Sequence, residues 1–294
     1  MRVGIDVPYF PARPDIRDYA QAAEDIGYHY LGFSGHVASA TDSPWPTPRF
    51  TFDEPWHEPF TLLAFLAGVT ERSELSPAVL LLPLYPPVLA AKQAAETDLL
   101  SGGRVRLVAA IGWNDRECAA LGVAPATRGR RFEEQVALLR RLWAERVVTH
   151  DGEFFQLHQV GISPRPGRPI PVWMGAGSIA AGGLPGPRAL DRIARIADGF
   201  KLLAPAALEP ERARAVLGDL RGRVAEHGRD PAAFGFEARL VLRLTPPAQW
   251  RPLVQFWQQA GASHLGVSTR LADGDVTAQI SNARAFADVT RDLW

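Results

Sequence analysis

The segment Leu75–Trp113 constrains the fold more than any other part of the chain. Leu75–Leu82 is almost entirely apolar, as expected of a strand that is covered on both faces in a parallel sheet. Proline cannot donate to a strand ladder, so Pro83 and the two prolines that follow end this run. A stretch with helical spacing then leads through two glycines to Val105–Ile111, which reads as a second buried strand. The segment therefore predicts a strand–helix–strand unit that ends in a glycine turn, where α/β proteins place their chemistry.

The same alternation of strand and helix continues along the whole chain. The expected strands are Arg2–Val7, Tyr30–Ser34, Leu75–Leu82, Val105–Ile111, Ile170–Met174, Asp198–Leu203, Phe234–Leu244 and His264–Val267. The expected helices are Ile16–Ile26, Pro59–Thr70, Val88–Leu100, Arg128–Glu145, Ala189–Ala197, Pro210–His227, Gln249–Ala260 and Val276–Asp288. Eight such repeats predict a closed (β/α)8 TIM barrel.

Two segments interrupt the alternation and predict insertions after the second and fourth strands. Val37–Trp56 is rich in Pro, Ser and Thr, and His150–Pro169 holds a short strand-like run between prolines. An open doubly wound sheet is the structural alternative. That fold usually carries Gly-x-Gly-x-x-Gly after its first strand, and Asp6–Tyr9 does not match it. We therefore expect a single TIM-barrel domain over residues 1–294.

Composition excludes several classes of function. Lys plus Arg and Asp plus Glu both number 32, so no overall field attracts nucleic acid or an acidic membrane. The lone Cys118 cannot form an intrachain disulfide, and no His or Cys spacing is typical of a metal site. We find no signal-like region or membrane-spanning run. The expected protein is cytoplasmic and holds no metal.

A set of short motifs resembles one enzyme family. In chain order they are Leu82–Pro87, Ala91–Gln93, Leu100–Val105, Gly112–Asn114 with Glu117, Arg128–Gly129, Gly152–Phe155, Pro171–Gly175 and Ala197–Phe200. Together they resemble the bacterial luciferase-like flavin and deazaflavin oxidoreductases over nearly the whole chain. The resemblance implies a TIM barrel that binds reduced FMN or coenzyme F420 at the carboxyl ends of its strands. The chain length and the Gly112–Asn114 turn are most similar to the F420-dependent class.

Two residues are candidates for catalysis by this resemblance. His36 follows the second strand, where relatives often carry an Asp-His pair near the reactive ring atom. A neutral imidazole can exchange a hydrogen bond with a substrate carbonyl, although here Gly35 replaces the usual carboxylate. Trp113 stands where sugar-phosphate dehydrogenases of the family have an acid, so we expect it to shape the pocket wall. The alternatives are a His36 that only lines the pocket and a Trp113 that is core. We expect Asp115 and Glu117 to be solvated rather than catalytic.

The expected cofactor contacts lie at three strand ends. Gly112 lets the backbone approach a planar ring and Asn114 offers an amide. Relatives have a cis peptide bulge behind the ring, and alignment on the double proline places it at Leu82–Pro83, where a cis X-Pro bond is cheap. The third contact is a small-residue turn that can cradle a phosphate with its N–H groups. Its residues are Gly175, Ala176, Gly177 and Ser178. A trans proline and a plain loop are the respective alternatives.

Other predicted contacts are less specific. Arg188 and Lys201 are the nearest cations for a phosphate. Trp45 and Trp56 lie in the long segment after the second strand and are candidates to stack on an apolar substrate.

The leading hypothesis is an oxidoreductase that moves a hydride between F420 and a small organic substrate. One alternative is a reduced-FMN-dependent monooxygenase that uses O2 and is supplied by a separate cofactor reductase. A second alternative is a barrel that binds a cofactor without turnover, favoured only by the missing acid before His36. The resemblance also implies a homodimer that uses the helices Pro59–Thr70 and Val88–Leu100.

Overall fold

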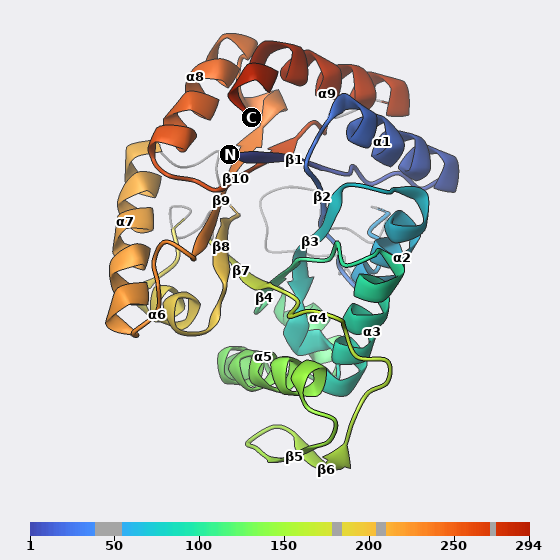
Figure 1. Ribbon diagram of the computed structural model, residues 1–294, viewed down its shortest axis with the longest axis vertical. Helices are drawn as coiled ribbons and strands as arrows, with labels where there is room; N and C mark the ends of the chain where they lie inside the picture. The colour runs from blue at the N-terminus through green and yellow to red at the C-terminus, as the bar shows by residue number, and fades with distance from the viewer. Residues whose placement is uncertain (39–54, 178–183, 204–209, 271–274) are drawn as a thin grey trace.

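A computed structural model describes residues 1–38, 55–177, 184–203, 210–270 and 275–294. Eight parallel strands form a closed barrel with the order β1-β10-β9-β8-β7-β4-β3-β2 (Figure 1). They are β1 (Arg2–Asp6), β2 (Tyr30–Phe33), β3 (Glu74–Leu81), β4 (Leu107–Ala110), β7 (Val172–Ala176), β8 (Gly199–Leu202), β9 (Gly235–Val241) and β10 (His264–Ser268). The predicted TIM barrel is confirmed. An open sheet is excluded because β1 pairs with both β2 and β10.

The helices surround this barrel, as Figure 1 shows. They are α1 (Arg13–Ile26), α2 (Pro59–Val69), α3 (Pro87–Leu100), α4 (Asp115–Ala120), α5 (Arg128–Ala144), α6 (Pro187–Ile196), α7 (Pro210–Glu226), α8 (Pro247–Gln259) and α9 (Val276–Thr290). The short helix α4 was not predicted. The insertion after the fourth strand is a hairpin of β5 (Val148–Asp151) and β6 (Gln156–Val160), which replaces the single predicted strand. No helix in the described ranges is both long and apolar enough to cross a membrane.

Local signals explain where these helices begin and end. Pro59 occupies the first turn of α2, and the Glu58 carboxylate accepts hydrogen bonds from the N–H groups of Phe60 and Thr61. Gly27 ends α1 with φ +104°, a left-handed conformation that glycine adopts without a steric penalty. The residues that mark helix ends in the sequence thus lie at the ends of these two helices in the structure.

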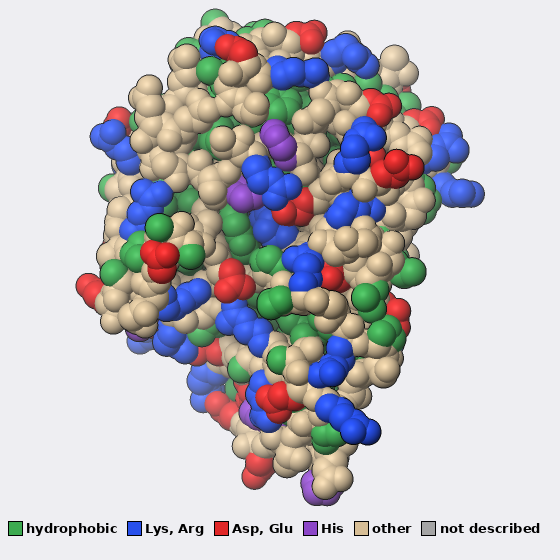
Figure 2. All heavy atoms as spheres, viewed as in Figure 1, with side chains coloured by type: hydrophobic (Ala, Val, Ile, Leu, Met, Phe, Trp, Pro, Cys, Tyr) green, Lys and Arg blue, Asp and Glu red, His purple; other side chains and the backbone are tan. Residues whose placement is uncertain are grey.

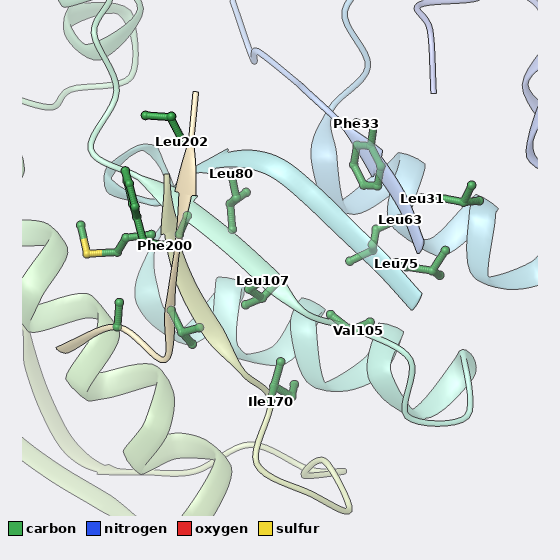
Figure 3. Close-up of a cluster of buried hydrophobic side chains, with 14 of the residues drawn as sticks. Leu31, Phe33, Leu63, Leu75, Leu80, Val105, Leu107, Ile170, Phe200 and Leu202 are labelled. Atoms are coloured by element: carbon green, nitrogen blue, oxygen red, sulfur yellow. The ribbon is translucent and has the colours of Figure 1, made fainter. Parts of the chain in front are cut away.

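The main hydrophobic core lies between the strands and the helices. Apolar side chains at alternate strand positions point outward, as Figure 3 shows for Leu31 and Phe33 of β2 and Leu107 of β4. Leu63 of α2 and residues of the other helices meet them, and these side chains are almost fully buried. Because two faces of each strand are covered, the strands read as nearly continuous apolar runs.

The inside of the barrel is charged. Seven side chains form a continuous series of ion pairs: Arg2, Glu74, Arg106, Glu237, Lys201, Asp6 and Arg239. At its centre, Glu237 accepts from Lys201 Nζ at 2.5 Å and from Arg106 Nη1 at 3.0 Å. Burial alone would raise the pKa of Glu237, but Lys201 and Arg106 outweigh it and lower that pKa to about 2. Glu237 therefore stays ionised inside the barrel because these two cations contact it.

The side chain of Trp173 fills the barrel interior near the amino ends of the strands. Its indole ring occupies the space where Gly199 and Gly235 have no side chain. A Cβ atom at Gly199 would lie 2.4 Å from the ring, and one at Gly235 would lie 2.1 Å from it. The ring also packs against the Arg106 guanidinium, 4.3 Å from the ring centroid, and edge-on to His264. Two glycines in adjacent strands are thus explained by one tryptophan.

We predict that Gly235→Ala destabilises the protein by about 1–3 kcal/mol, because the new methyl group overlaps the Trp173 ring. Gly222→Ala in α7 is the matched control. A Cβ at Gly222 meets nothing within 4 Å, and the alanine reduces the conformational freedom of the unfolded chain. We therefore expect Gly222→Ala to be neutral or stabilising. Urea unfolding measures both. Equal stability of the two variants would contradict the packing described for Trp173.

We also predict a specific pH dependence from His264. Burial and then the charge of Arg106 lower the pKa of His264 to about 4 from an ordinary 6.5. The folded protein therefore binds fewer protons than the unfolded chain between these values, so stability falls as the pH drops from about 6.5 to 4, by up to about 3 kcal/mol. His264→Gln should flatten this slope, whereas replacement of the exposed His158 should not. Unfolding free energies measured across this pH range provide the check.

Candidate functional site

The carboxyl end of β2 brings His36 to the barrel mouth. Ser34 anchors the turn, since its hydroxyl donates to the Ala78 carbonyl of β3 at 2.8 Å. Gly35 is required at the next position: a Cβ there would lie 2.6 Å from the His57 carbonyl oxygen and 2.7 Å from Pro59 Cγ. An Asp-His pair therefore has no room in this turn. The glycine that replaces the usual carboxylate is a consequence of local packing.

A carboxylate still reaches His36, from a different part of the chain. Glu117 of α4 lies 2.7 Å from His36 Nδ1 through its Oε2 atom. Its Oε1 atom accepts from the N–H groups of Val37 at 2.8 Å and Ala38 at 3.2 Å. The Glu117 side chain is 1% exposed, so the expectation that it is solvated is wrong. The sequence analysis missed this partner because the two residues are 81 positions apart.

Aromatic rings surround His36. Trp56 meets the imidazole edge-on at a centroid distance of 5.0 Å, and Trp113 does so at 6.0 Å. Tyr9 packs on Trp56 at a centroid distance of 4.1 Å, and the guanidinium of Arg270 lies over the Tyr9 ring. The structure thus brings together three of the predicted residues, His36, Trp56 and Trp113. Trp45 lies outside the described residues.

The turn after β4 is held by helix capping. Gly112 has φ +82°, which favours glycine, and Arg128 Nη1 donates to its carbonyl oxygen at 3.3 Å. Asn114 is buried, and its side-chain oxygen accepts from the N–H groups of Arg116 and Glu117. Asn114 is therefore the N-cap of α4 and fixes the helix that carries Glu117. Its contact with a cofactor stays a prediction.

The third strand differs from the prediction. The Leu82–Pro83 bond is trans, since the one cis bond among the described residues is Ser163–Pro164. Leu82 begins a 3-10 turn, is fully buried, and its carbonyl oxygen accepts from Tyr85 N and Gln135 Nε2. These contacts hold the turn in its trans form. The expected cis bond is wrong, and cofactor contacts of Leu82 and Pro83 stay a prediction.

The strand irregularity lies earlier, at Val79. The β3–β4 register shifts between Ala78 and Leu80, which marks a bulge. Val79 Cγ1 would lie 2.4 Å from a Cβ at Gly175, so the glycine in β7 leaves room for this bulge. Gly175 and Ala176 are strand residues, and Gly177 follows with φ +118°. Of the predicted phosphate turn, Ser178 lies outside the described residues.

The two cations predicted to bind a phosphate lie in different environments. Arg188 is exposed near the start of α6. Lys201 is 2% exposed inside the barrel and paired with Glu237. Lys201 is thus already paired with a buried carboxylate, and its contact with a phosphate arm stays a prediction.

Charged groups that the sequence analysis missed line the same mouth. Arg239 Nη2 lies 3.4 Å from Asp6 Oδ2, and its Nη1 donates to the Leu203 carbonyl oxygen at 3.0 Å. Asp6 Oδ1 lies 3.8 Å from Lys201 Nζ. The sequence holds a signal for them, because charged residues occupy alternate positions in otherwise apolar strands, as Glu237 and Arg239 do in β9.

Comparison with known proteins finds several relatives of this chain. An F420-dependent glucose-6-phosphate dehydrogenase of Kineococcus radiotolerans is 30% identical over 277 residues, covering 88% of this chain and 75% of the relative. A pyrimidine monooxygenase, RutA, of Allorhizobium ampelinum is 32% identical over 183 residues, covering 60% of this chain and 47% of the relative. The chain spans 64% of the length of the first curated relatives it matches, such as a protein of Mycobacterium tuberculosis that is 35% identical over 59% of this chain.

Solved structures share the fold. An F420-dependent secondary alcohol dehydrogenase in complex with an F420-acetone adduct superposes with a TM-score of 0.79 at 16% identity, covering 99% of both chains. The family model described as luciferase-like monooxygenase matches residues 2–293. The chain thus has a closed barrel, a His after its second strand and a family match over almost its whole length. The chain belongs to the luciferase-like monooxygenase family.

Proposed function

We propose that this protein is an oxidoreductase that transfers a hydride between coenzyme F420 and a small organic substrate. The observation that carries the proposal is the His36–Glu117 pair, set among Trp56 and Trp113 at the barrel mouth. The F420-dependent relative that aligns with 88% of the chain supports the choice of cofactor. When bound, the deazaflavin would donate or accept the hydride.

The residues at the mouth fit a flat ring with a phosphorylated arm. Gly112 presents backbone without a Cβ at the tip of β4, whereas the side chains of Val79 and Leu203 fill the space over Gly175 of β7. Trp113 supplies an aromatic wall beside these two strands. Gly177, with φ +118°, follows β7, and successive backbone N–H groups in such a turn can hold a phosphate. We assign the ring to the mouth side of Val79, at the tips of β3, β4 and β7.

His36 would handle the proton that accompanies hydride transfer. A carboxylate only accepts hydrogen bonds, so Glu117 favours the imidazole tautomer with its proton on Nδ1. Nε2 then carries the lone pair that can accept a proton from a substrate hydroxyl as an alcohol is oxidised. In the reverse direction the imidazolium returns that proton to a carbonyl oxygen. Glu117 stabilises the charged ring in both directions.

The main alternative is a reduced-FMN-dependent monooxygenase that uses O2 and a separate reductase. The pyrimidine monooxygenase among the relatives supports it. The only argument for a cofactor-binding barrel without turnover was the missing carboxylate before His36. Glu117 contacts His36 with a carboxylate, so that argument does not support this alternative.

Cofactor titration separates these functions. We predict that F420 at low micromolar concentration quenches tryptophan fluorescence and FMN does not. Trp113→Phe should lose much of the quenching. Trp294→Phe should keep it, because Trp294 stacks on Tyr28, which lies before the amino end of β2 and away from the mouth. Quenching by FMN alone would favour the monooxygenase. Quenching by neither cofactor would overturn both functions.

A second prediction concerns the tautomer of His36. In Glu117→Gln the amide oxygen can still accept from Val37 and Ala38, while the NH2 group faces Nδ1. Nδ1 must then accept, so the ring proton moves to Nε2. Ring nitrogen chemical shifts in NMR report the change, and an unchanged tautomer would contradict the proposed role of Glu117. Glu117→Leu is the comparison variant. It leaves the N–H groups of Val37 and Ala38 without an acceptor, which should lower the free energy of unfolding by about 1–3 kcal/mol for each group.

We further propose a homodimer through α2 and α3. Leu89, Leu99 and Leu100 of α3 are 49%, 41% and 71% exposed, which leaves apolar surface on this helix. The double variant Leu99→Asp/Leu100→Asp should shift the protein to monomer in analytical ultracentrifugation. Val289→Asp, at a similarly exposed position of α9, should not. A monomeric parent protein would refute the dimer.

A further inference from the structure

A second cavity lies at the amino ends of the strands, on the face opposite His36. Its volume is about 890 Å³, within the range of small-molecule sites. Segments that lead into four strands line it: residues 166–171 before β7, Asp198 before β8, residues 232–234 before β9 and Ser263 before β10. The carboxyl end of α5 forms a further wall with Arg140 and Trp143. Figure 2 looks onto this face and shows basic, acidic and histidine side chains gathered near its centre beside a hollow.

The cavity has an aromatic interior. Trp143 and Phe234 are both 6% exposed, and Trp173 closes the end inside the barrel. Because the Trp173 ring fills the space over Gly199 and Gly235, it separates this cavity from the catalytic mouth. His264 lines the same end, and burial holds its pKa at about 4, so it is a neutral imidazole near pH 7. A planar apolar body matches these walls.

The rim of the cavity carries an excess of positive charge. Arg140 and Arg168 line it, and each makes its ion pair through Nη2 alone, with Asp198 and Asp98 respectively. Arg168 Nε is buried and has no hydrogen-bond partner among the described residues. Both aspartates also accept backbone N–H groups, from Val172 and Val105 respectively. Two guanidinium groups and one carboxylate, that of Asp198, thus line the cavity.

We propose that this cavity is a second ligand site and that it binds a small aromatic carboxylate. The ring system lies among Trp143, Trp173 and Phe234, and the carboxylate accepts from the N–H groups of Arg140 that Asp198 leaves unpaired and from Arg168 Nη1. A neutral aromatic compound gains the same apolar contacts and lacks the charged hydrogen bonds. The site is independent of the redox chemistry at the opposite face.

Calorimetric titration with 2-naphthoate and with the neutral 2-naphthalenemethanol tests the proposal. We expect 2-naphthoate to bind at least tenfold more tightly, a preference that Arg140→Gln reduces. Ala233→Trp places a bulky ring in the cavity from an exposed position and should abolish binding. Ala225→Trp, on an exposed position of α7, should leave binding unchanged.

Two outcomes would overturn the site. Equal binding of the two probes, or binding of neither, would show that the cavity does not select an anion. Binding that survives Ala233→Trp would place the probe elsewhere, including the catalytic mouth. F420 and FMN titrations of Ala233→Trp should match those of the parent protein, which shows that the variant is folded and keeps this test separate from the redox function.

Discussion

The series of ion pairs along the barrel axis is the constraint on which the rest of the structure depends. Arg106, Lys201 and Glu237 are at most 3% exposed and sit where many barrels pack branched apolar side chains. Each charge is tolerable only because a neighbour of opposite sign compensates its desolvation, and loss of one partner from such a pair typically costs about 3–5 kcal/mol. The strands are therefore coupled across the barrel by charge as well as by their backbone ladder.

This charged interior also divides the molecule into two faces. Arg2 and Glu74 stand at the amino end of the strands, and Asp6 and Arg239 stand at the catalytic mouth. Trp173 and the paired charges lie inside the barrel between these two ends. The barrel thus has the His36–Glu117 pair at one end and a chemically distinct cavity at the other.

The site shows how one packing requirement leads to another. Gly35 is needed because the chain at His57 and Pro59 passes too close for a side chain. The carboxylate that orients His36 then comes from Glu117 on α4, a helix that Asn114 caps. Residues that follow two different strands are therefore joined in a single His–Glu pair, and the same carboxylate accepts from the N–H groups of Val37 and Ala38.

Much of the architecture followed from local pattern. The apolar runs, the prolines at helix starts and Gly27 act over a few residues, so the eight strands and their helices were predictable from the sequence. The position of His36 and the family resemblance were predictable for the same reason, since they rest on short motifs in a fixed order. The bulge was placed at Leu82–Pro83 because proline is the visible local signal, whereas Val79 carries none.

The sequence by itself therefore determined the barrel, its family and the position of His36 after the second strand. Only the tertiary structure decided which groups meet: Glu117 with His36, Lys201 with Glu237, and Trp173 with two glycines of other strands. The physical reason is that hydrophobic periodicity reports whether a side chain faces inward, while ion pairs and ring contacts depend on distances across a closed barrel between residues far apart in the chain.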